Sequence, residues 1–487
     1  MLAFLMIVSI VACDNTPDEP SETTGDPETT VPEETTTEEA TTEEPTTDDG
    51  KMSAPEYNGV FKTGYARADI TPSESQLPLG EFTKVNNPVY ATCVAVNDGD
   101  KTVILVSVDQ KSISADHCDE IRDRIKGVTG IAVDNIFISA THNHAITPFA
   151  TNNTNNNTKN WSKGSFVKIA AAAKNAINDL ADTEIFIGRA NSSGMAFVRR
   201  YVTSFGLMSS VIPADNSVKS VRKPDEDIQI IRFARKDKKD IIMTNWQAHL
   251  ADAVDKDKDA ISADMAHFIR EDIEAGNEDA LVVYFAGASA NINLTPARKG
   301  LRKYEDYIAV AKAFAEKVLG VINSEDKLTK VQAGKITVTK EVFAADHKDD
   351  SAEEIAAARA RLESDKLNPD ARSVLKQAAD RYLVARNERD FTNLKIAAIS
   401  FGDIAFTTVP YEMFDNNGVE IKDGSRFKMT FILTNSDGDY AYMPAIEACG
   451  EDGYGGYETE ATYFEVGVAE KLVERYVAML NAHKGIS

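Results

Sequence analysis

The stretch "TVILVSVDQKSISADHCDEIRDRIKGVTGIAVDNIFISATHNH" (Thr102–His144) carries the pattern that decides the fold. Its first part, "TVILVSVD", is a Val- and Ile-rich run that predicts a buried strand ending in a carboxylate. "SADHCDEIRDRIKGVTG" has helical spacing and closing glycines, and "NIFISATHNH" predicts the next strand. A helix, "GSFVKIAAAAKNAINDLAD", and a strand, "EIFIGRA", are expected to follow. This β-α-β-α-β order predicts an α/β fold with mixed β-sheets flanked by helices.

Later segments extend this pattern. Five apolar runs predict further strands: "IQIIRFAR", "DIIMTNWQAH", "ALVVYFAGAS", "KIAAISFGDIAFTTVP" and "KMTFILTN". Residues from Asp350 to about Asp390 predict a helical hairpin inserted near 350–390, because the Asn-Pro of "DKLNPD" ends a helix. The charges of this hairpin indicate a solvated face, and we assign it no chemistry. "TNNTNNNTKNW" (Thr151–Trp161) predicts a polar loop.

The charge of the chain argues against one class of partner. Of the formal charge of -24, residues 14–50 contribute -14 through 14 acidic residues and no Lys or Arg, which leaves -10 for residues 51–487. Nucleic-acid binding requires basic patches that displace counterions. The sequence therefore predicts no nucleic-acid partner.

The N-terminus predicts an export and anchoring segment. "MLAFLMIVSIVAC" (1–13) is apolar, too short to cross a bilayer of about 30 Å, and suited to a signal peptide, although no basic residue precedes it. Its "IVAC" ending resembles a bacterial lipobox, so we expect lipidation at Cys13; a short apolar terminus that frays is the alternative. Residues 14–55 are rich in Thr, Glu and Pro and predict a disordered linker. Residues 56–487 would then be a folded domain, lipid-anchored outside the cytoplasm on a bacterial cell membrane.

Candidate metal ligands stand where predicted strands end. If "NIFISATHNH" is extended to its end, His142 and His144 point to the same face, at the edge of the sheet where α/β proteins bind ligands. This pair alone fits a polar strand end equally well. His249 ends another apolar run, and Glu412 follows a strand and a proline in "FTTVPYEMF". Two histidines and a carboxylate, with one position left for water, are a common catalytic zinc arrangement.

Several segments, in order, resemble the neutral/alkaline non-lysosomal ceramidase family over about residues 60–480. "SATHNHA" is similar to that family's Ser-Ala-Thr-His-Thr-His-Ser signature and is the most specific match. The other matching segments are "GYARADITP", "NWQAHLADAV" with "ISADMAHFI", "FTTVPYEMF", "DYAYMP" and "GGYETEATY". The resemblance implies a ceramidase-like catalytic domain.

The resemblance also implies a Zn²⁺ ligand set. It places zinc on His142, His249, Glu412 and a tyrosine. Tyr442 matches the tyrosine best, and Tyr440 competes with it.

Two further residues gain expected roles from the same resemblance. His144 would support the transition state beside the metal. Arg199 falls where the family has an arginine near the substrate, although a surface arginine is the alternative because Arg200 adjoins it.

The chain also departs from the family pattern. The family's Gly-Asp-Val-Ser-Pro segment aligns with "GASANINLTP", which puts Asn291 on the aspartate and Asn293 on the catalytic serine, with Ser289 nearby but out of register. "AITPFAT" (145–151) replaces a glycine-rich segment, and we expect no counterpart of the immunoglobulin-like C-terminal domain of better-known ceramidases. These departures bear on ceramide specificity more than on the metal.

The leading functional prediction is a zinc-dependent amide hydrolase. Zinc would activate water and polarise the scissile carbonyl, His144 would accept the water's proton, and Tyr442 or Asn293 would bind the oxyanion. Asparagine at the serine position favours direct attack by water. The expected substrate is an N-acyl lipid of ceramide type. A zinc hydrolase of another small amide or ester is one alternative, and a surface binding protein without turnover is another. The sequence leaves the oligomeric state open.

Overall fold

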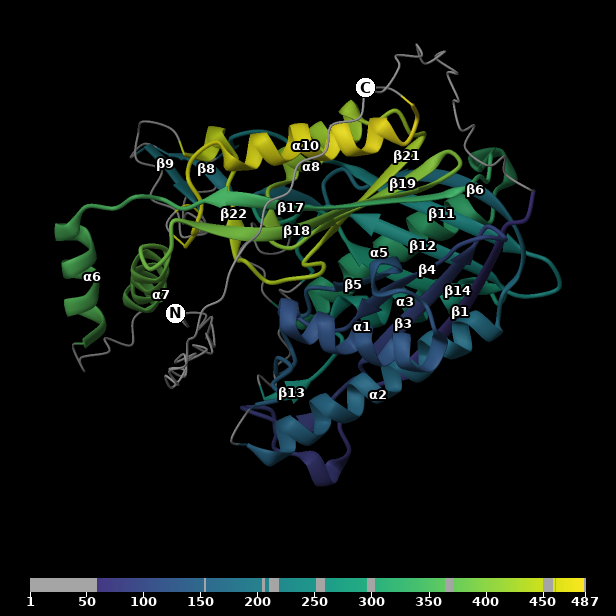
Figure 1. The fold of residues 1–487 in the computed structure, drawn as a ribbon, viewed down its shortest axis with the longest axis horizontal. Coiled ribbons are helices and arrows are strands. Elements are labelled where there is room, and N and C mark those ends of the chain that lie inside the picture. Colours follow the sequence, from purple (N-terminus) through teal and green to yellow (C-terminus); the bar gives the residue numbers. More distant parts are fainter. Residues whose placement is uncertain are drawn as a thin grey trace, which may run out of the picture. The chain divides into compact units, whose positions relative to one another are not determined.

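Two β-sheets packed face to face form the centre of the fold (Figure 1). The computed structural model describes residues 59–152, 155–203, 206–209, 219–250, 259–295, 303–363, 371–449, 459 and 461–485. Residues 57–487 form one compact unit. The predicted signal segment, Cys13 and the predicted linker lie outside the described residues. Apolar side chains of both sheets, such as Phe137 and Phe406, interdigitate between them and bury the central core.

The larger sheet has nine strands. Its order is β14 (Ala280–Ala286), β12 (Asp240–Trp246), β11 (Asp227–Arg235), β6 (Ala181–Asn191), β1 (Lys62–Asp69), β3 (Tyr90–Asn97), β4 (Thr102–Val108) and β5 (Ile136–Ala140), with β16 (Thr329–Val331) beside β6. The sheet curls, and its edge strand β14 approaches β4, the strand next to the opposite edge: the Ser107 hydroxyl of β4 donates to the carbonyl of Tyr284 in β14 at 2.6 Å. The smaller sheet has the order β17 (Ile336–Asp346), β18 (Phe391–Phe401), β19 (Ile404–Val409) and β21 (Met429–Thr434).

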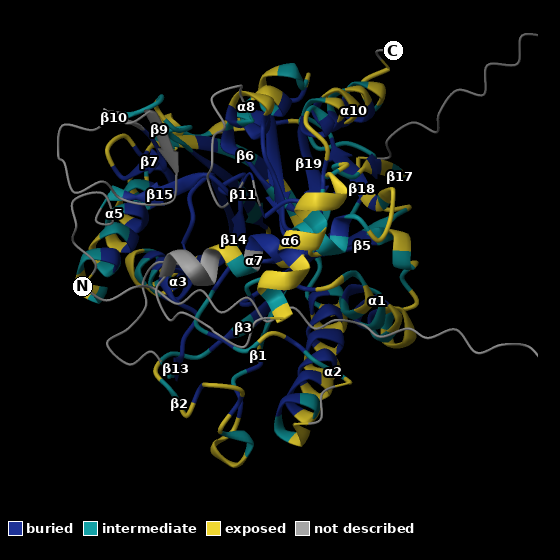
Figure 2. Cartoon of the chain, turned by 90° about the vertical axis from the view of Figure 1, so that its left-hand side faces the viewer, coloured by how far each residue is buried: buried dark blue, intermediate teal, exposed yellow. Residues whose placement is uncertain are grey.

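Helices cover the outer face of each sheet, which gives four layers. Helices α1 (Ala115–Thr129) and α2 (Asn156–Asn178) pack under β1, β3 and β4. Helices α3 (Met265–Gly276) and α5 (Tyr304–Ile322) cover the β12–β14 end of the same sheet. Helices α8 (Asp415–Gly424) and α10 (Val468–Ala482) cover the smaller sheet. Figure 2 shows these helices blue toward the sheets and yellow outward, as an amphipathic helix on a core requires. The expected α/β class is therefore confirmed.

Three parallel strand pairs determine where the loops gather. The pairs are β4 with β5, β12 with β14, and β19 with β21. The ends of β5 and β21 meet across the two sheets, because the Ala140 amide donates to the carbonyl of Asn435 at 3.0 Å. The Thr434 hydroxyl also donates to the carbonyl of Gly287, just past β14, at 2.9 Å. The segments that follow these strands therefore share one edge of the fold.

Three local expectations need correction. The strand expected over Asn135–His144 ends at Ala140. Helix α2 begins at Asn156, inside the expected polar loop, because the Asn155 side chain caps the amides of residues 157 and 158. The run "KIAAISFGDIAFTTVP" forms two strands, since Gly402 turns the chain at a φ of 64° with no room for a Cβ beside the carbonyl of Gln332.

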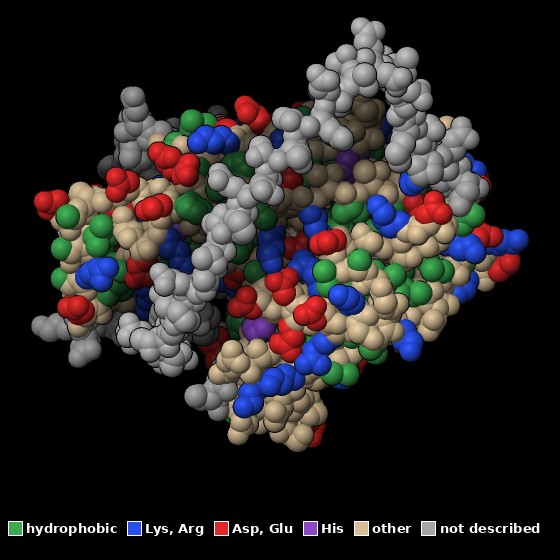
Figure 3. Space-filling model, in the orientation of Figure 1, with side chains coloured by type: hydrophobic (Ala, Val, Ile, Leu, Met, Phe, Trp, Pro, Cys, Tyr) green, Lys and Arg blue, Asp and Glu red, His purple; other side chains and the backbone are tan. Residues whose placement is uncertain are grey.

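The helical hairpin is confirmed as α6 (Ala352–Glu363) and α7 (Ala371–Arg386). Its expected solvated face is wrong in part, because Asp380 and Arg386 are buried in ion pairs with Arg361 and Asp350. On the face of the molecule that Figure 3 shows, acidic and basic side chains are interspersed. Within the described ranges, no helix combines the length and apolar character needed to span a membrane.

The remaining strands are short and connect the layers. They form the pairs β2 (Lys84–Val85) with β13 (Ala260–Ile261), β7 (Ala196–Val198) with β15 (Ile292–Leu294), and β20 (Glu412–Met413) with β22 (Tyr442–Met443), besides a small sheet of β8 (Arg200–Thr203), β9 (Gly206–Ser209) and β10 (Lys219–Ser220). The β7–β15 and β20–β22 pairs hold several of the residues considered next.

Candidate metal centre

Three histidine side chains converge at the edge where the loops gather. The Nε2 atoms of His142 and His144 lie 3.3 Å apart. The ring of His249 lies 4.8 Å from that of His142 and 5.3 Å from that of His144, centre to centre. One ligand atom from each ring falls within 4.8 Å of the others. His142 and His144 follow β5, and His249 follows β12, so the strands bring together residues more than a hundred positions apart.

The backbone turn at His142 aims its ring. Strand alternation does not bring His142 and His144 together, as the sequence suggested, because β5 has already ended. His142 adopts a φ of 64°, a left-handed conformation that is uncommon for a residue with a side chain. Its Nδ1 donates to the carbonyl of Lys111 at 2.9 Å, with the Asn435 side-chain amide 3.1 Å from the same nitrogen. This bond leaves the Nε2 lone pair directed at the other candidate ligands, which is the usual support of a metal-binding histidine.

Glu412 and Tyr442 complete one side of the cluster. They are paired in register in the two-stranded β20–β22 sheet, and the side chains of Tyr442 and Glu412 share a hydrogen bond. Glu412 Oε2 lies 3.7 Å from His142 Nε2. Two ligands bound at about 2.1 Å in a tetrahedral site are about 3.4 Å apart, so both short separations in this cluster suit a shared zinc-sized ion.

The protonation states also suit a cation. Burial lowers the pKa of His142 to about 4, and it lowers the pKa of His144 and His249 well below the usual value; the charges of Lys111 and Arg199 act in the same direction. Burial raises the pKa of Glu412 to about 7. The contact between His142 and Glu412 is therefore not an ion pair near neutral pH, because His142 is neutral there. Neutral imidazoles are the form that binds metals.

Buried polar atoms without hydrogen-bond partners test whether the residues of this site suit a metal ion. Both ring nitrogens of His249 and Oε2 of Glu412 are buried and have no hydrogen-bond partner among the described residues. Buried polar atoms without partners are rare in folded proteins and call for an explanation such as a bound ion. Because these atoms lie in a cluster of imidazole and carboxylate donors, the residues present fit a zinc-type metal.

The predicted substrate-side residues lie on a neighbouring pair of strands. Arg199 is buried beside the β7–β15 pair, where its Nη1 donates to Oδ1 of Asn293 at 3.4 Å and its Nη2 donates to the carbonyl of Ala290. Because a guanidinium only donates, the Asn293 oxygen faces Arg199, and among the described residues its amide nitrogen has no acceptor. Ser289 is buried in the turn before these residues.

The two candidate tyrosines are placed differently. The Tyr440 ring packs beside Gly438 and Pro410, and the charges that act on its pKa belong to Lys395, Asp116 and Asp119 rather than to the histidine cluster. The structure therefore brings Tyr442, but not Tyr440, to Glu412. Tyr442 is 6% exposed, so it lies in the interior of the site.

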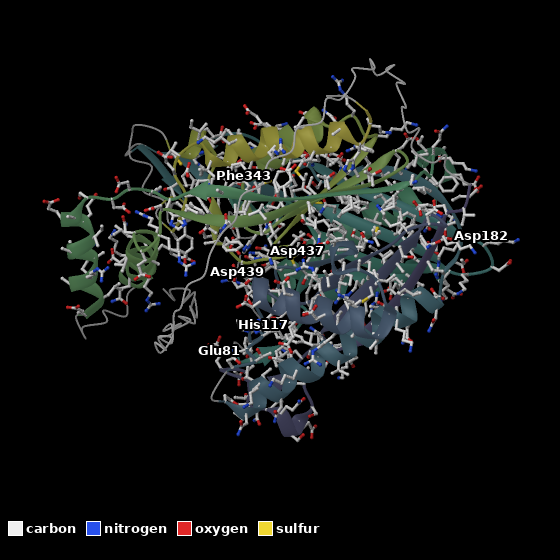
Figure 4. All side chains as sticks on the ribbon, in the orientation of Figure 1. Glu81, His117, Asp182, Phe343, Asp437 and Asp439 are labelled. Carbon is white, nitrogen blue, oxygen red and sulfur yellow. The ribbon has the colours of Figure 1, made fainter. Side chains whose placement is uncertain are left out.

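Three residues near the cluster were not singled out by the sequence. Lys111 and Asn435 contact His142, and Asp439 is an exposed carboxylate whose charge raises the pKa of His142 and Glu412. Figure 4 labels Asp439 at the end of the sheets opposite to Asp182. Lys111 and Asn435 also follow apolar strands, so the strand-end pattern used for the histidines would have included them.

The fold, although not the sequence, matches known proteins. The sequence matches no protein-family model and no curated protein. The structure superposes on a neutral ceramidase from Pseudomonas aeruginosa with a TM-score of 0.64 and 13% identity, covering 88% of this chain and 75% of that chain. A ceramidase complexed with C2 gives a TM-score of 0.63 at the same identity and coverage. The expected ceramidase-like fold is confirmed.

Proposed function

We propose that this protein is a zinc-dependent amide hydrolase that cleaves the N-acyl bond of a ceramide-like lipid. The observation that carries the proposal is the cluster of His142, His144, His249 and Glu412, with buried donor atoms that lack partners among the described residues. Its setting in a ceramidase fold supports the choice of amide hydrolysis.

The division between ligands and helper follows the family resemblance, because the geometry alone also places the Nε2 atom of His144 3.3 Å from that of His142. His142, His249, Glu412 and Tyr442 would hold the ion, and His144 would remain free to accept a proton. A zinc ion in this site supplies Lewis acidity toward the scissile carbonyl and lowers the pKa of water. His144 would suit the role of general base by its position, because its Nε2 lies 3.3 Å from Nε2 of the proposed ligand His142.

The other residues of the site would orient the substrate. The side-chain nitrogen of Asn293 is available to hydrogen bond the oxygen on which negative charge develops, because Arg199 holds its other end. Such a donor typically contributes about 3 kcal/mol to lowering the barrier. The buried guanidinium of Arg199 adds positive charge close to the same region. No serine nucleophile is assigned, since asparagine occupies that position.

The membrane location is a separate part of the proposal. Lipidation at Cys13 would hold the folded unit on the outer side of a bacterial cell membrane, with residues 14–55 as a spacer, where it would meet N-acyl lipids. Mass spectrometry of membrane fractions tests this directly. An unmodified Cys13 would refute the anchor without affecting the proposed chemistry.

Metal analysis and a substrate panel test the catalytic proposal. Purified residues 55–487 should hold about one zinc per chain and release fatty acid from a short-chain fluorescent ceramide. Release only from other N-acyl compounds or esters would favour the broader zinc hydrolase. The absence of metal under zinc-replete conditions would favour a binding protein. A His142→Ala protein that kept full zinc and full turnover would overturn the scheme.

A further inference from the structure

Near the metal centre, one buried residue joins three of the segments that build it, partly through its carboxylate and partly through its main chain. Asp415 is the first residue of α8 and is fully buried. It lies three residues after Glu412, so its position determines how the chain leaves β20. A carboxylate at a helix N-terminus is favoured by the helix dipole, which suits Asp415 to this place.

The first contact joins Asp415 to the segment that holds Asn293. The Asn291 side chain donates to Asp415 Oδ1 at 2.9 Å and accepts from the Asp415 amide at 2.9 Å, so the two residues form a reciprocal pair. The Asn291 carbonyl in turn accepts from the amide of Arg199 at 2.8 Å. The same carboxylate therefore sets the distance between the Glu412 segment and the residues expected to face the substrate.

The second contact joins Asp415 to the segment that holds His249. Gln247 lies two residues before His249, and its side chain donates to the main-chain carbonyl of Asp415 at 3.0 Å. This contact reaches the carboxylate only indirectly, through the position of the Asp415 backbone. Helix α8 is seated tightly there, because a Cβ on Gly418 would lie 2.2 Å from Oε1 of Gln247. His249 receives no hydrogen bond of its own from the described residues, so its position depends on such contacts along the backbone.

A partly buried arginine, Arg222, pairs with this carboxylate. Arg222 donates to both carboxylate oxygens of Asp415, with Nη1 to Oδ2 at 2.9 Å, and the Asp225 amide donates to Oδ2 at 3.3 Å. Burial alone would lower the pKa of Arg222, but the hydrogen bonds and charge of Asp415 raise it above the usual value. The charge-assisted contact to both oxygens therefore fixes the orientation of the Asp415 carboxylate.

We infer that Asp415 is a positioning residue that holds Glu412, His249 and Asn293 in the geometry needed for metal binding and turnover. This inference rests on the proposed function. Outer partners of metal ligands typically contribute 10–100-fold to metal affinity, which is the effect expected here.

The hairpin provides a matched control. Asp380 is also fully buried and is also bound through both oxygens by one arginine, Arg361, at 2.7 and 2.8 Å. It lies in α7, outside the segments that hold the metal-centre residues. Asp380→Ala therefore reproduces the loss of a buried ion pair without the proposed positioning effect.

The experiment compares four full-length proteins: the unaltered protein, Asp415→Ala, Asp415→Asn and Asp380→Ala. For each, chelator competition gives the zinc affinity, thermal unfolding gives the stability, and steady-state kinetics give kcat and KM separately. We expect Asp415→Ala to bind zinc about 10–100-fold more weakly and to lose kcat, and Asp415→Asn to lie near the low end of that range. Asp380→Ala should lower the unfolding temperature comparably and leave zinc affinity unchanged.

Two results would contradict the inference. The first is a zinc affinity of Asp415→Ala equal to that of Asp380→Ala. The second applies if Asp415→Ala does not fold: it is a zinc affinity of Asp415→Asn equal to that of the unaltered protein. Failure of the proposed function gives a different result from failure of the inference alone. In the first case the unaltered protein binds no zinc; in the second it binds zinc, but the Asp415 variants bind it as tightly as the control.

Discussion

Glu412 and Tyr442 occupy paired positions in the parallel β20–β22 register, and their side chains share a hydrogen bond. Tyr440, two residues earlier, does not share this environment. Residues at i and i+2 of a strand would face the same way, but Ala441 between them has a φ of 61° and breaks the alternation. A single backbone torsion therefore separates two tyrosines that the sequence left as competitors.

This separation predicts that the two tyrosines differ in function. Tyr442→Phe should lower kcat by about 10²–10³, the cost typical of losing one donor or ligand that acts on the reacting group. Tyr440→Phe should leave kcat nearly unchanged, because its hydroxyl lies among α1 charges. Steady-state kinetics of both variants on the same N-acyl substrate make the comparison. Equal losses in the two variants would contradict the placement of Tyr442 in the site.

The histidines should divide into ligands and a helper. His142→Ala and His249→Ala should abolish stoichiometric zinc binding, whereas His144→Ala should keep zinc with an affinity loss of no more than about 100-fold. His144→Ala should still lose about 10²–10⁴ in kcat, because the proton acceptor is gone. Metal analysis after dialysis and single-substrate kinetics provide the two measurements. Loss of zinc from all three variants alike would instead make His144 a ligand.

Zinc affinity should depend on pH through Glu412. Burial raises the pKa of this carboxyl to about 7, so in the metal-free protein it is mostly protonated below that pH and must release its proton to bind zinc. Affinity should therefore be full above pH 7 and fall about tenfold per unit between pH 7 and 5. His142 competes with protons only near its lower pKa of about 4.

A chelator-competition titration from pH 5.5 to 8, corrected for the chelator's own protonation, measures this slope. Glu412→Gln should bind zinc more weakly but lose the slope, since no carboxyl remains to titrate. An affinity that stays constant between pH 6 and 8 in the unaltered protein would contradict the assignment of Glu412.

The loop that leads to Tyr442 should depend on a buried ion pair. Arg122 of α1 pairs with Asp437, and both side chains are buried, at 6% and 4% exposure. Asp437 also accepts from the amide of Ile138 in β5 at 3.0 Å. Arg122→Met should cost about 3–5 kcal/mol, because it leaves the Asp437 charge buried without its cation.

Lys395→Ala is the matched control for this pair. It removes an ion pair of 2.8 Å to Asp119, but both of those side chains are about half exposed, at 54% and 48%. Its cost should be about 1 kcal/mol or less. Urea unfolding of the metal-free proteins compares the two, and similar midpoints for Arg122→Met and Lys395→Ala would count against a role for the buried pair.

The strand pattern predicted much of the fold because its elements are long and strongly patterned. The runs that became β4, α1, β5, β11, β12 and β14 were all apparent as apolar periodicity. The ends of these elements were less predictable. Local caps and turns decide them, such as Asn155 at the start of α2 and Gly402 between β18 and β19.

The sequence by itself determined which residue types stand after the apolar strands, and hence that His142, His249 and Glu412 were candidates for one site. Only the tertiary structure decided that they meet, because parallel pairing and the contact between β5 and β21 bring distant strand ends to one edge. It also decided the approach of His142 to His144 and the choice between Tyr442 and Tyr440. These depend on left-handed backbone torsions at His142 and Ala441, which long-range hydrogen bonds stabilise and no local pattern encodes.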